Sequence, residues 1–547
     1  MPLTMPSFTG QIGVAFVAGL LAHRAYFIHG ERDLQAANIA RAHIAILFLL
    51  AYLKSQAQGF TFQYAAQEAL ILIGIYSLAL FVSIIIYRLF FSPLSRAPGP
   101  IAMRISKLSH VWALMDYRVR NCEMLHDLEK KYGKVVRTGP NEVTLFGYDA
   151  YDQIRRADSR CQRAQYYDIL HPMVSLNTTR NPEVHAHRRK LWDQAFSVKA
   201  LERNEHCVYE YANKLSQVLH GLVGKNINIS NYFEYYTFDL MGLINLTVDF
   251  QSLQQEEHPI LDLWHIAHKL LGPLNSAPWL KHLFMGIPFI ERIKYYRQFM
   301  GWAHDELATK IKNNQEDRKN LIGYVISDAM DHGGVEKNWN FVLGDFVLAV
   351  AAGSDPVRQV LTNLVYYLLK YPNQLELVRR ELESIDINDY RALQSLAHLN
   401  ACIYETLRLN PAVPSAGLRI PPKGGMTFDG VFIPEYTTIV TPQYTLHRDE
   451  TCFVRAGEWI PERFTTRPEL MPNKNAFVAW SIGKMSCLGK SLSLLEIRVG
   501  AAVFLRDFDF KFAPGEDGTE MFTEATDFFT TTPGPLHLVL RDRKNVC

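Results

Sequence analysis

A lone cysteine lies between two glycines near the C-terminal end of the chain. The segment Trp480–Gly489 reads WSIGKMSCLG and precedes an apolar helical pattern from Lys490 to Phe504. A cysteine directly before a helix receives backbone N–H groups and the positive end of the helix dipole, which favour its thiolate. Flanking glycines allow a sharp turn and the close approach of a flat ligand. A thiolate on such a loop can be the axial ligand of a haem iron, whereas the alternative is a buried structural cysteine.

The composition narrows the classes of protein that fit. The chain has 547 residues, 57 Lys and Arg against 55 Asp and Glu, and 12% aromatic residues. This balance excludes a disordered polyelectrolyte and argues against a nucleic-acid-binding protein. The seven cysteines are spread along the chain without CxxC pairs, which excludes a disulfide framework and a zinc ribbon. Cys487 is therefore the cysteine whose neighbours suit chemistry.

A second segment combines a glycine, an acid and a proline within a helical pattern. The segment Ala352–Pro356 (AGSDP) lies inside a pattern that extends from about residue 341 to residue 369. Proline has no amide hydrogen, so it opens the hydrogen-bond ladder of the helix at this point. Ser354 precedes Pro356 by two residues and therefore faces another side of the helix. The Ser354 hydroxyl therefore cannot simply take the place of a hydroxyl group on a side chain at position 356.

Two further patterns place charged residues on helices. Glu405 and Arg408 are three residues apart, so they share one helix face and can pair. The segment His185–Ser197 (HAHRRKLWDQAFS) has the pattern of a basic helix. Each pattern alone also fits an ordinary solvated helix face. Their order along the chain relative to Cys487 makes them informative.

Together these motifs resemble those of the cytochrome P-450 family, the haem-thiolate monooxygenases. The haem loop of the family has an aromatic residue, a glycine, a cysteine and a second glycine, and this sequence matches at Trp480, Gly483, Cys487 and Gly489. It departs from the family at Met485, where a cation for a haem propionate is usual. The resemblance extends over essentially the whole chain beyond residue 91.

The resemblance implies roles for the residues near this loop. Cys487 would ligate the iron of haem b, and Arg463 would dock onto the Glu405–Arg408 pair as structural support rather than as a catalytic group. The haem-binding residues that the resemblance implies are Cys487, Trp480, Gly483, Gly489, His185, Arg189 and Arg419. Because Met485 cannot pair with a propionate, His185, Arg189 and Arg419 would bind most of the negative charge of the haem propionates.

On the other side of the haem, the resemblance implies catalytic roles for Gly353 and Asp355. In the family, the glycine allows oxygen to lie close to the helix, and the acid works with a threonine to relay protons. This sequence has Pro356 where that threonine belongs. Either proton delivery is rerouted through Asp355 and water, which we favour, or the reaction depends less on that relay.

The expected fold is mainly α with small β-sheets, the cytochrome P-450 fold, behind an N-terminal helical membrane anchor. The expected activity is a monooxygenase that oxidises a small lipophilic substrate with O2, in fungal secondary-metabolite biosynthesis. Electrons would come from NADPH through a membrane-bound cytochrome P-450 reductase, with cytochrome b5 as a second candidate partner, and no nucleic acid is expected. The alternatives are a haem-thiolate isomerase or dehydratase that needs neither O2 nor reductase, and a non-catalytic haem-binding relative.

The first 91 residues are expected to form the anchor. Ala69–Tyr87 contains 19 residues without a formal charge, which is long enough to cross a bilayer. Residues 8–27 and 37–53 are weaker candidates. The distribution of Lys and Arg places the N-terminus outside and everything after Arg88 in the cytosol if all three span. In the alternative, only the third segment spans. We expect the endoplasmic reticulum membrane, with the catalytic domain facing the cytosol.

Residues 92–100 (SPLSRAPGP) are expected to be a stiff hinge, because prolines cannot continue the membrane helix. Residues 101–547 would then form one haem-thiolate catalytic domain. This part of the chain shows no internal repeat and no second linker. After the anchor is subtracted, 52 basic and 52 acidic residues remain, so the body has no net formal charge.

Overall fold

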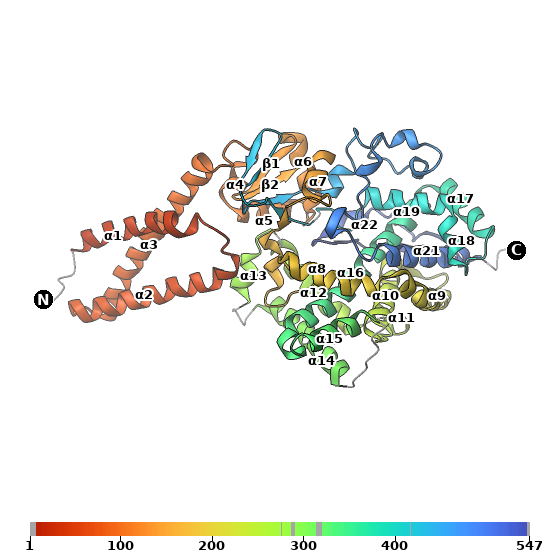
Figure 1. Ribbon diagram of the computed structural model, residues 1–547, viewed down its shortest axis with the longest axis horizontal. Coiled ribbons are helices and arrows are strands. Elements are labelled where there is room, and N and C mark those ends of the chain that lie inside the picture. Colours follow the sequence, from red (N-terminus) through yellow and green to blue (C-terminus); the bar gives the residue numbers. More distant parts are fainter. Residues whose placement is uncertain are drawn as a thin grey trace.

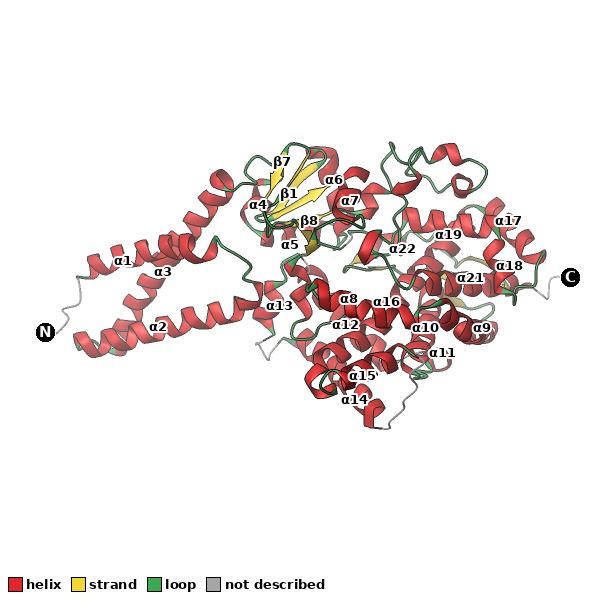
Figure 2. Cartoon of the chain, viewed as in Figure 1, coloured by secondary structure: helices red, strands yellow, loops and turns green. Residues whose placement is uncertain are grey.

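The computed structural model describes residues 7–256, 258–274, 276–285, 290–312, 320–415 and 417–543. Three helices form an arm at one end of the molecule, and the rest of the chain forms a rounded body of helices with small sheets (Figures 1 and 2). The prediction of a mainly α fold with small sheets behind N-terminal apolar helices is therefore confirmed.

The arm consists of α1 (Phe8–Ala22), α2 (Ala36–Gln58) and α3 (Phe62–Ile86), which ends in a π-helical turn at Tyr87–Phe91. Helices α1 and α2 both pack against α3. By length and apolarity, Asp33–Ala57 and Phe62–Phe91 can cross a membrane, whereas α1 is not among the helices that meet both criteria. The long helix α16 (Val335–Lys370) also meets them, but most of it is buried in the body, so it is a core helix.

The connection between α1 and α2 lies beside the body, and the α2–α3 connection lies at the far end of the arm (Figure 1). Glu31, in the α1–α2 connection, forms an ion pair with Arg180 of the body at 2.7 Å. Arg180 also pairs with Asp168 at 2.7 Å and donates a hydrogen bond to the carbonyl of Arg163. The arm therefore contacts the body at a second place besides the covalent connection.

The Pro-rich segment after α3 is packed against the body rather than extended into solvent. The helical turn ends before Ser92, and Leu94 and Ala97 are buried. The fully buried guanidinium of Arg137 donates hydrogen bonds to the carbonyl oxygens of Arg88 and Leu94 and to the hydroxyl of Ser92. The expected hinge thus ends the apolar helix α3 and then packs along strand β1 (Val135–Gly139).

The described residues of the body form four small sheets. The largest has the strand order β1-β2-β8-β5-β3, and β2 pairs in parallel with β8 so that Val143 lies opposite Ile439. A three-stranded sheet has the order β4-β12-β9, and two hairpins complete the set. The strands are β1 (Val135–Gly139), β2 (Glu142–Leu145), β3 (Gln162–Arg163), β4 (Asn226–Asn228), β5 (Arg419–Ile420), β6 (Met426–Phe428), β7 (Val431–Ile433), β8 (Thr438–Val440), β9 (Phe508–Phe512), β10 (Thr526–Asp527), β11 (Thr531–Thr532) and β12 (His537–Asp542).

The main hydrophobic core is formed where α9, α10, α16, α19 and α21 pack together. Helix α16 passes through it and continues into a second core with α15. The helices of the body are α4 (Ile101–Ile105), α5 (Lys107–Asp116), α6 (Asn121–Tyr132), α7 (Tyr148–Arg155), α8 (Pro182–Ala195), α9 (Val198–His220), α10 (Ile229–Met241), α11 (Ser252–Gln255), α12 (Pro259–Leu274), α13 (Trp279–Phe284), α14 (Glu291–Lys312), α15 (Leu321–Asp331), α16 (Val335–Lys370), α17 (Pro372–Glu383), α18 (Tyr390–Ser395), α19 (Ala397–Leu409), α20 (Gln443–Leu446), α21 (Lys490–Asp507) and α22 (Glu520–Thr523).

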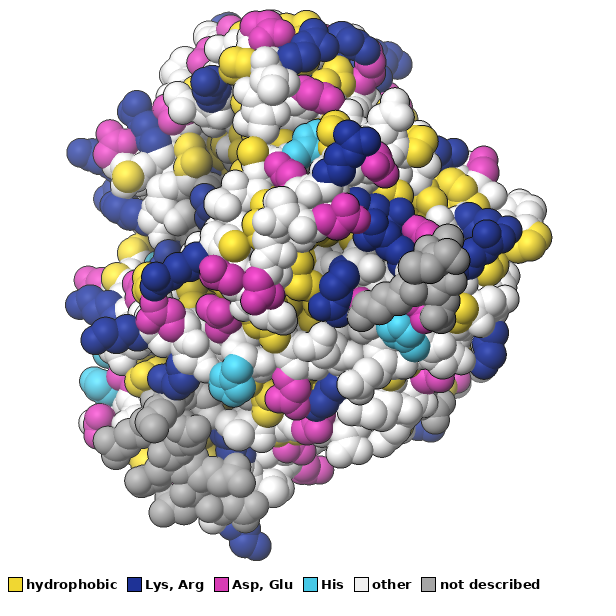
Figure 3. Space-filling view, turned by 90° about the vertical axis from the view of Figure 1, so that its right-hand side faces the viewer, with side chains coloured by type: hydrophobic (Ala, Val, Ile, Leu, Met, Phe, Trp, Pro, Cys, Tyr) yellow, Lys and Arg dark blue, Asp and Glu magenta, His cyan; other side chains and the backbone are white. Residues whose placement is uncertain are grey.

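The end of the body opposite the arm has the surface of a water-soluble domain. On this face, Lys and Arg side chains are interspersed with Asp and Glu, and hydrophobic side chains are scattered (Figure 3). The contrast with the arm is clear, because α1, α2 and α3 expose many large apolar side chains. Such exposed apolar helices require a lipid environment or a partner.

Candidate functional site

A cavity of about 320 Å³ lies in the centre of the body. Three parts of the chain border it: the loop that carries Cys487, the middle of α16, and a group of basic residues from α7, α8, β3 and β5. Apolar side chains from other elements, such as Val413 and Phe529, complete the lining. The structure thus brings together segments that lie far apart in the sequence, from Arg155 to Phe529.

The side chain of Cys487 is exposed to this cavity. Its loop forms a 3₁₀ turn at Gly483–Met485, the N–H of Cys487 donates a 2.8 Å hydrogen bond to the carbonyl of Trp480, and α21 begins three residues later at Lys490. A side chain built at Gly489 would meet only the Cys487 sulfur, at 3.8 Å. The space above the thiol is therefore open to a flat ligand.

Two expectations for this loop need correction. Gly483 does not border the cavity: its φ is +73°, and a Cβ there would lie 2.1 Å from the carbonyl oxygen of Arg155. Gly483 therefore serves the turn and its packing against the end of α7. The pKa of the Cys487 thiol is raised, because burial outweighs the lowering effects of the N–H of Gly489 and of Arg189. The helix terminus alone does not produce a thiolate, which a bound metal ion would stabilise.

The three predicted propionate-binding residues, His185, Arg189 and Arg419, all border the cavity. Asn181 caps α8 by accepting hydrogen bonds from its first N–H groups, and the helix then presents His185 and Arg189 one turn apart. The guanidinium of Arg189 donates to the carbonyl of Ser486 at 2.8 Å, which joins α8 to the cysteine loop. Burial and the nearby arginines lower the pKa of His185 to about 4.

Two further arginines, Arg155 and Arg163, border the same cavity and were not predicted. Both are buried, and burial lowers the pKa of Arg163 to about 10. Within the part of the chain that the structure describes, the Nε of Arg163 has no hydrogen-bond partner. Arg163 lies on the two-residue strand β3, which is too short to be recognised from an alternating pattern. Its neighbours Gln162, Ala164 and Gln165 form no pattern that indicates a ligand-binding residue.

Within the described residues, no carboxylate lies within ion-pair distance of Arg155, Arg163 or Arg419. Buried guanidinium groups without a counter-charge are energetically unfavourable. A ligand that carries two carboxylates, such as haem, would supply the missing negative charge. The cavity therefore fits haem by three independent features: the exposed thiol, the open space beside Gly489 and the uncompensated arginines.

The middle of α16 forms the opposite wall, where Ala352, Gly353 and Pro356 border the cavity. A Cβ on Gly353 would lie 2.0 Å from the terminal methyl group of Met241 in α10. Gly353 thus makes room for Met241, which also borders the cavity. Ser354 is buried and donates a 2.8 Å hydrogen bond to the carbonyl of Val350, so its hydroxyl is used within the helix.

Asp355 is buried on a different face of α16 and does not border the cavity. Its Oδ2 accepts a 3.3 Å hydrogen bond from the indole N–H of Trp264 in α12. The structure therefore separates the two predicted catalytic residues: Gly353 faces the cavity, whereas the Asp355 carboxylate faces α12. Movement of this carboxylate or a chain of water molecules is needed to connect it with the cavity.

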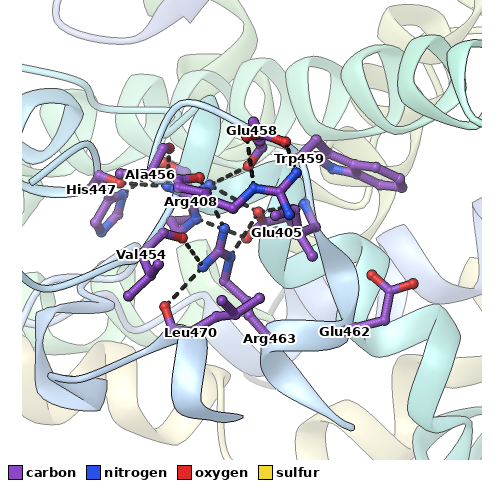
Figure 4. Close-up of polar contacts among 12 residues, drawn as sticks. Glu405, Arg408, His447, Val454, Ala456, Glu458, Trp459, Glu462, Arg463 and Leu470 are labelled. Carbon is purple, nitrogen blue, oxygen red and sulfur yellow. Dashed lines mark hydrogen bonds and ion pairs between the residues drawn. The ribbon is translucent and has the colours of Figure 1, made fainter. Parts of the chain in front are cut away.

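The Glu405–Arg408 pair and Arg463 form a fully buried cluster (Figure 4). Arg408 donates two hydrogen bonds to the Glu405 carboxylate, both of 2.8 Å, and Arg463 Nε donates a third of 2.9 Å. The N–H of Ile460 also donates to Glu405 at 2.8 Å. The remaining guanidinium N–H groups donate to backbone carbonyls, among them those of Ala456, Val454 and Leu470. The cluster thus joins α19 to the segment that leads to the loop.

His447 lies next to this cluster and is held in its neutral form. Its Nδ1 donates a 3.0 Å hydrogen bond to the carbonyl of Arg408, and its Nε2 accepts one of 3.1 Å from the N–H of Val478. Burial, together with the positive charge of Arg408, lowers the pKa of His447 to about 3. A histidine in an unfolded chain titrates near pH 6.5.

Between pH 6.5 and about 3, the unfolded chain therefore binds a proton at His447 that the folded chain does not bind. The contribution of this group to stability is fully present above pH 6.5 and falls as the pH is lowered through that window. We expect the urea midpoint of unfolding to fall between pH 6.5 and 4, and His447→Gln to reduce this slope. The exposed His206→Gln is the control, and an equal slope in wild type and H447Q would contradict the assignment.

Comparison with known proteins agrees with this geometry. The sequence profile of the cytochrome P-450 family matches residues 106–539. The chain is 33% identical to cytochrome P-450 monooxygenase FCK2 of Fusarium pseudograminearum (strain CS3096), over 96% of this chain and 97% of the relative. It is 31% identical to tryprostatin B 6-hydroxylase of Aspergillus fumigatus, over 99% and 98%. It is also 31% identical to cytochrome P-450 monooxygenase notG′ of Aspergillus versicolor, over 96% and 97%.

A cavity with an exposed cysteine thiol, an arginine-rich rim and a long core helix opposite defines a haem-thiolate protein. The chain belongs to the cytochrome P-450 family. It is accordingly an oxidoreductase of the monooxygenase class, and its cofactor is haem whose iron has a cysteine thiolate ligand. A redox partner, O2 and an organic substrate follow from this class.

Proposed function

We propose that Cys487 is the iron ligand of this monooxygenase. The observation that carries the assignment is the position of its side chain, which faces the cavity opposite α16. The other free cysteines of the described chain are Cys122, Cys161, Cys207, Cys402 and Cys452, and none of them borders the cavity. When bound, the haem iron supplies the site at which O2 is activated.

The haem propionates are held by the basic rim. His185, Arg189 and Arg419 are joined in this role by Arg155 and Arg163, which lie on the same cavity. The two additional arginines compensate for Met485, which brings no charge to its position. Trp480 and Gly489 border the haem space at the cysteine loop. Glu405, Arg408 and Arg463 act at a distance by fixing the segment that leads to this loop.

The electron donor is an NADPH–cytochrome P-450 reductase, with cytochrome b5 as a second candidate. Lys190 on α8, Lys484 in the cysteine loop and Lys490 at the start of α21 are all exposed. All three lie on segments that carry haem-side residues, so they offer positive charge to an acidic redox partner near the cofactor. Electron transfer favours a partner that docks close to the haem.

The substrate is a small lipophilic compound, oxidised in fungal secondary-metabolite biosynthesis. The cavity wall away from the basic rim is formed by apolar side chains such as Leu348, Val360 and Val413. Apolar cavities with a few polar groups select lipophilic ligands. The relatives reported above are fungal monooxygenases, and one of them is named as a hydroxylase of tryprostatin B.

The test is turnover of the full chain in microsomes that contain the reductase. The reduced, carbon-monoxide-treated sample is expected to give the red-shifted absorption band of a thiolate-ligated haem. A panel of lipophilic natural products that begins with tryprostatin B is expected to yield a product with one added oxygen atom, dependent on NADPH and reductase. Absence of the thiolate band would contradict the proposal. Product formation without NADPH or O2 would instead favour the isomerase or dehydratase alternative, for which Pro356 is the specific argument.

The body faces the cytosol at the endoplasmic reticulum membrane, and the arm crosses the membrane three times. Support comes from the α1–α2 connection, which lies beside the body, whereas the α2–α3 connection lies at the far end of the arm (Figure 1). The ion pair between Glu31 and Arg180 requires these two residues to be on the same side of the membrane. If only α3 crossed the membrane, the α1–α2 and α2–α3 connections would not have to lie on opposite sides of it.

Cysteines introduced at the exposed positions His29 and Phe60 distinguish the two arrangements. We expect His29→Cys to react with a membrane-impermeant maleimide in intact microsomes, because it lies in the α1–α2 connection. Phe60→Cys, in the α2–α3 connection, is expected to react only after detergent is added. Labelling of both variants without detergent would contradict three spans, and a chain without an added cysteine provides the background.

A further inference from the structure

Pro356 leaves one carbonyl of α16 without its helical donor. In an α-helix, the N–H of each residue donates to the carbonyl four residues earlier. Proline has no N–H, so the carbonyl of Ala352 receives no hydrogen bond from position 356. The helix nevertheless continues on both sides, from Val335 to Lys370, with Pro356 inside it.

This carbonyl lies on the cavity side of the helix. Ala352 and Pro356 are one turn apart, and both border the cavity. The carbonyl of a helical residue lies between that residue and the one four positions later. The side chain of Ala352 is exposed even though α16 is a core helix, which agrees with its position at the cavity wall.

The neighbouring polar side chains of α16 already form hydrogen bonds with other groups. The Ser354 hydroxyl donates to the carbonyl of Val350. The Asp355 carboxylate accepts from Trp264 on another face of the helix. Among residues 352–356, the Ala352 carbonyl is thus the polar group at the cavity wall that has lost its regular partner. A carbonyl in a largely apolar cavity gains most from a hydrogen-bond donor that enters the cavity.

We propose that the Ala352 carbonyl is an acceptor that holds a hydrogen-bond donor, an O–H or N–H group, beside the reacting position. The donor belongs to a water molecule or to the substrate itself. It occupies the region where the family has a threonine hydroxyl, so the proline that removes the hydroxyl also creates a replacement binding position. This inference rests on the proposed monooxygenase activity and adds a positioning group to it.

The test compares wild type with Pro356→Ala and Pro356→Thr. Alanine restores the N–H at position 356, which then donates to the Ala352 carbonyl, but it adds no hydroxyl. Threonine supplies both the N–H and a hydroxyl. With the panel compound that wild type oxidises, P356A is expected to form about tenfold less product per NADPH, the factor that one hydrogen bond supplies. Hydrogen peroxide release should rise correspondingly. P356T is expected to remain close to wild type.

Misfolding cannot explain the expected loss, because removal of a proline from a helix interior favours the helix. P356A should therefore unfold at a temperature no lower than wild type. Pro372→Ala, at the first turn of α17, is the matched control, since that proline opens no carbonyl in the cavity, and its coupling should be unchanged. Equal coupling in P356A and wild type would overturn the proposal.

A matched pair of small probes separates the two sources of the donor. Toluene and benzyl alcohol differ by one hydroxyl, and their binding is measured by the shift of the haem absorption spectrum. If a ligand hydroxyl binds the carbonyl, wild type prefers the alcohol and P356A loses this preference. If water holds the position, wild type shows no preference, and P356A differs only in coupling. A preference for the alcohol that persists in P356A would overturn the proposal even if no panel compound is oxidised.

Discussion

Replacement of Glu405 by glutamine is expected to lower the free energy of unfolding by about 3–5 kcal/mol, the usual cost of breaking a buried ion pair. Haem incorporation is expected to be lost. The side chain keeps its size in this variant, so the effect comes from charge. Arg408 and Arg463 would both remain fully buried without a counter-charge.

The structural reason is the number of groups that depend on this carboxylate. Glu405 accepts hydrogen bonds from both guanidinium groups and from the N–H of Ile460. Arg408 in turn donates to the carbonyls of Ala456 and Glu458, in the segment that leads to the cysteine loop. Loss of the charge therefore loosens the segment that positions Cys487.

Glu462→Gln is the matched control for this prediction. Glu462 lies next to Arg463 in sequence but points away from the cluster (Figure 4), and it accepts a hydrogen bond from Gln374. Its replacement is expected to change stability by less than about 1 kcal/mol. The measurements are urea unfolding and haem content per chain. Full haem content in E405Q would show that the cluster does not support the haem loop.

Replacement of Cys487 by serine is expected to remove the thiolate-type band of the carbon monoxide complex and to lower turnover at least about 100-fold. Even changes in the groups around a metal ligand commonly cost roughly 10–100-fold, and loss of the ligand itself should cost more. The side chain faces the cavity and not the packed core, so the variant should still fold. Haem content and the spectrum are measured on the same sample.

Cys207→Ser is the control for this prediction, because Cys207 lies half-buried on α9 and does not border the cavity. Its spectrum and turnover should equal those of wild type. A thiolate-type band that persists in C487S would assign the iron ligand to another cysteine. The two variants therefore separate loss of the ligand from a general effect of removing a thiol.

The sequence was most informative where an extended pattern is repeated over several turns or strands. The short runs rich in β-branched residues at 142–146 and 438–441 form β2 and β8, which pair in parallel. The long apolar pattern near residues 341–369 is α16, and the pattern after Cys487 is α21. Such elements are recognisable because burial acts on every turn or every second residue.

The parts of the site that could not be predicted depend on contacts between distant segments. Arg163 reaches the cavity because β3 pairs with β5, and Arg155 is held there by hydrogen bonds to the Thr441 hydroxyl and the Gly417 carbonyl; neither residue lies in a pattern that indicates this. The role of Gly483 depends on the carbonyl of Arg155, which is more than three hundred residues away. The raised pKa of Cys487 depends on its depth in the folded body, which the order of residues near a helix does not reveal.

Arg180 attaches the arm to the body at a point other than the covalent connection after α3. A body held by one flexible connection could tilt freely over the bilayer, whereas two separate attachments fix an orientation. One attachment is the packed segment after α3, and the other is the contact of Glu31 with Arg180. Because Arg180 also donates a hydrogen bond to the backbone carbonyl of Arg163, a residue of the cavity rim, the side chain that binds the arm also contacts the wall of the cavity.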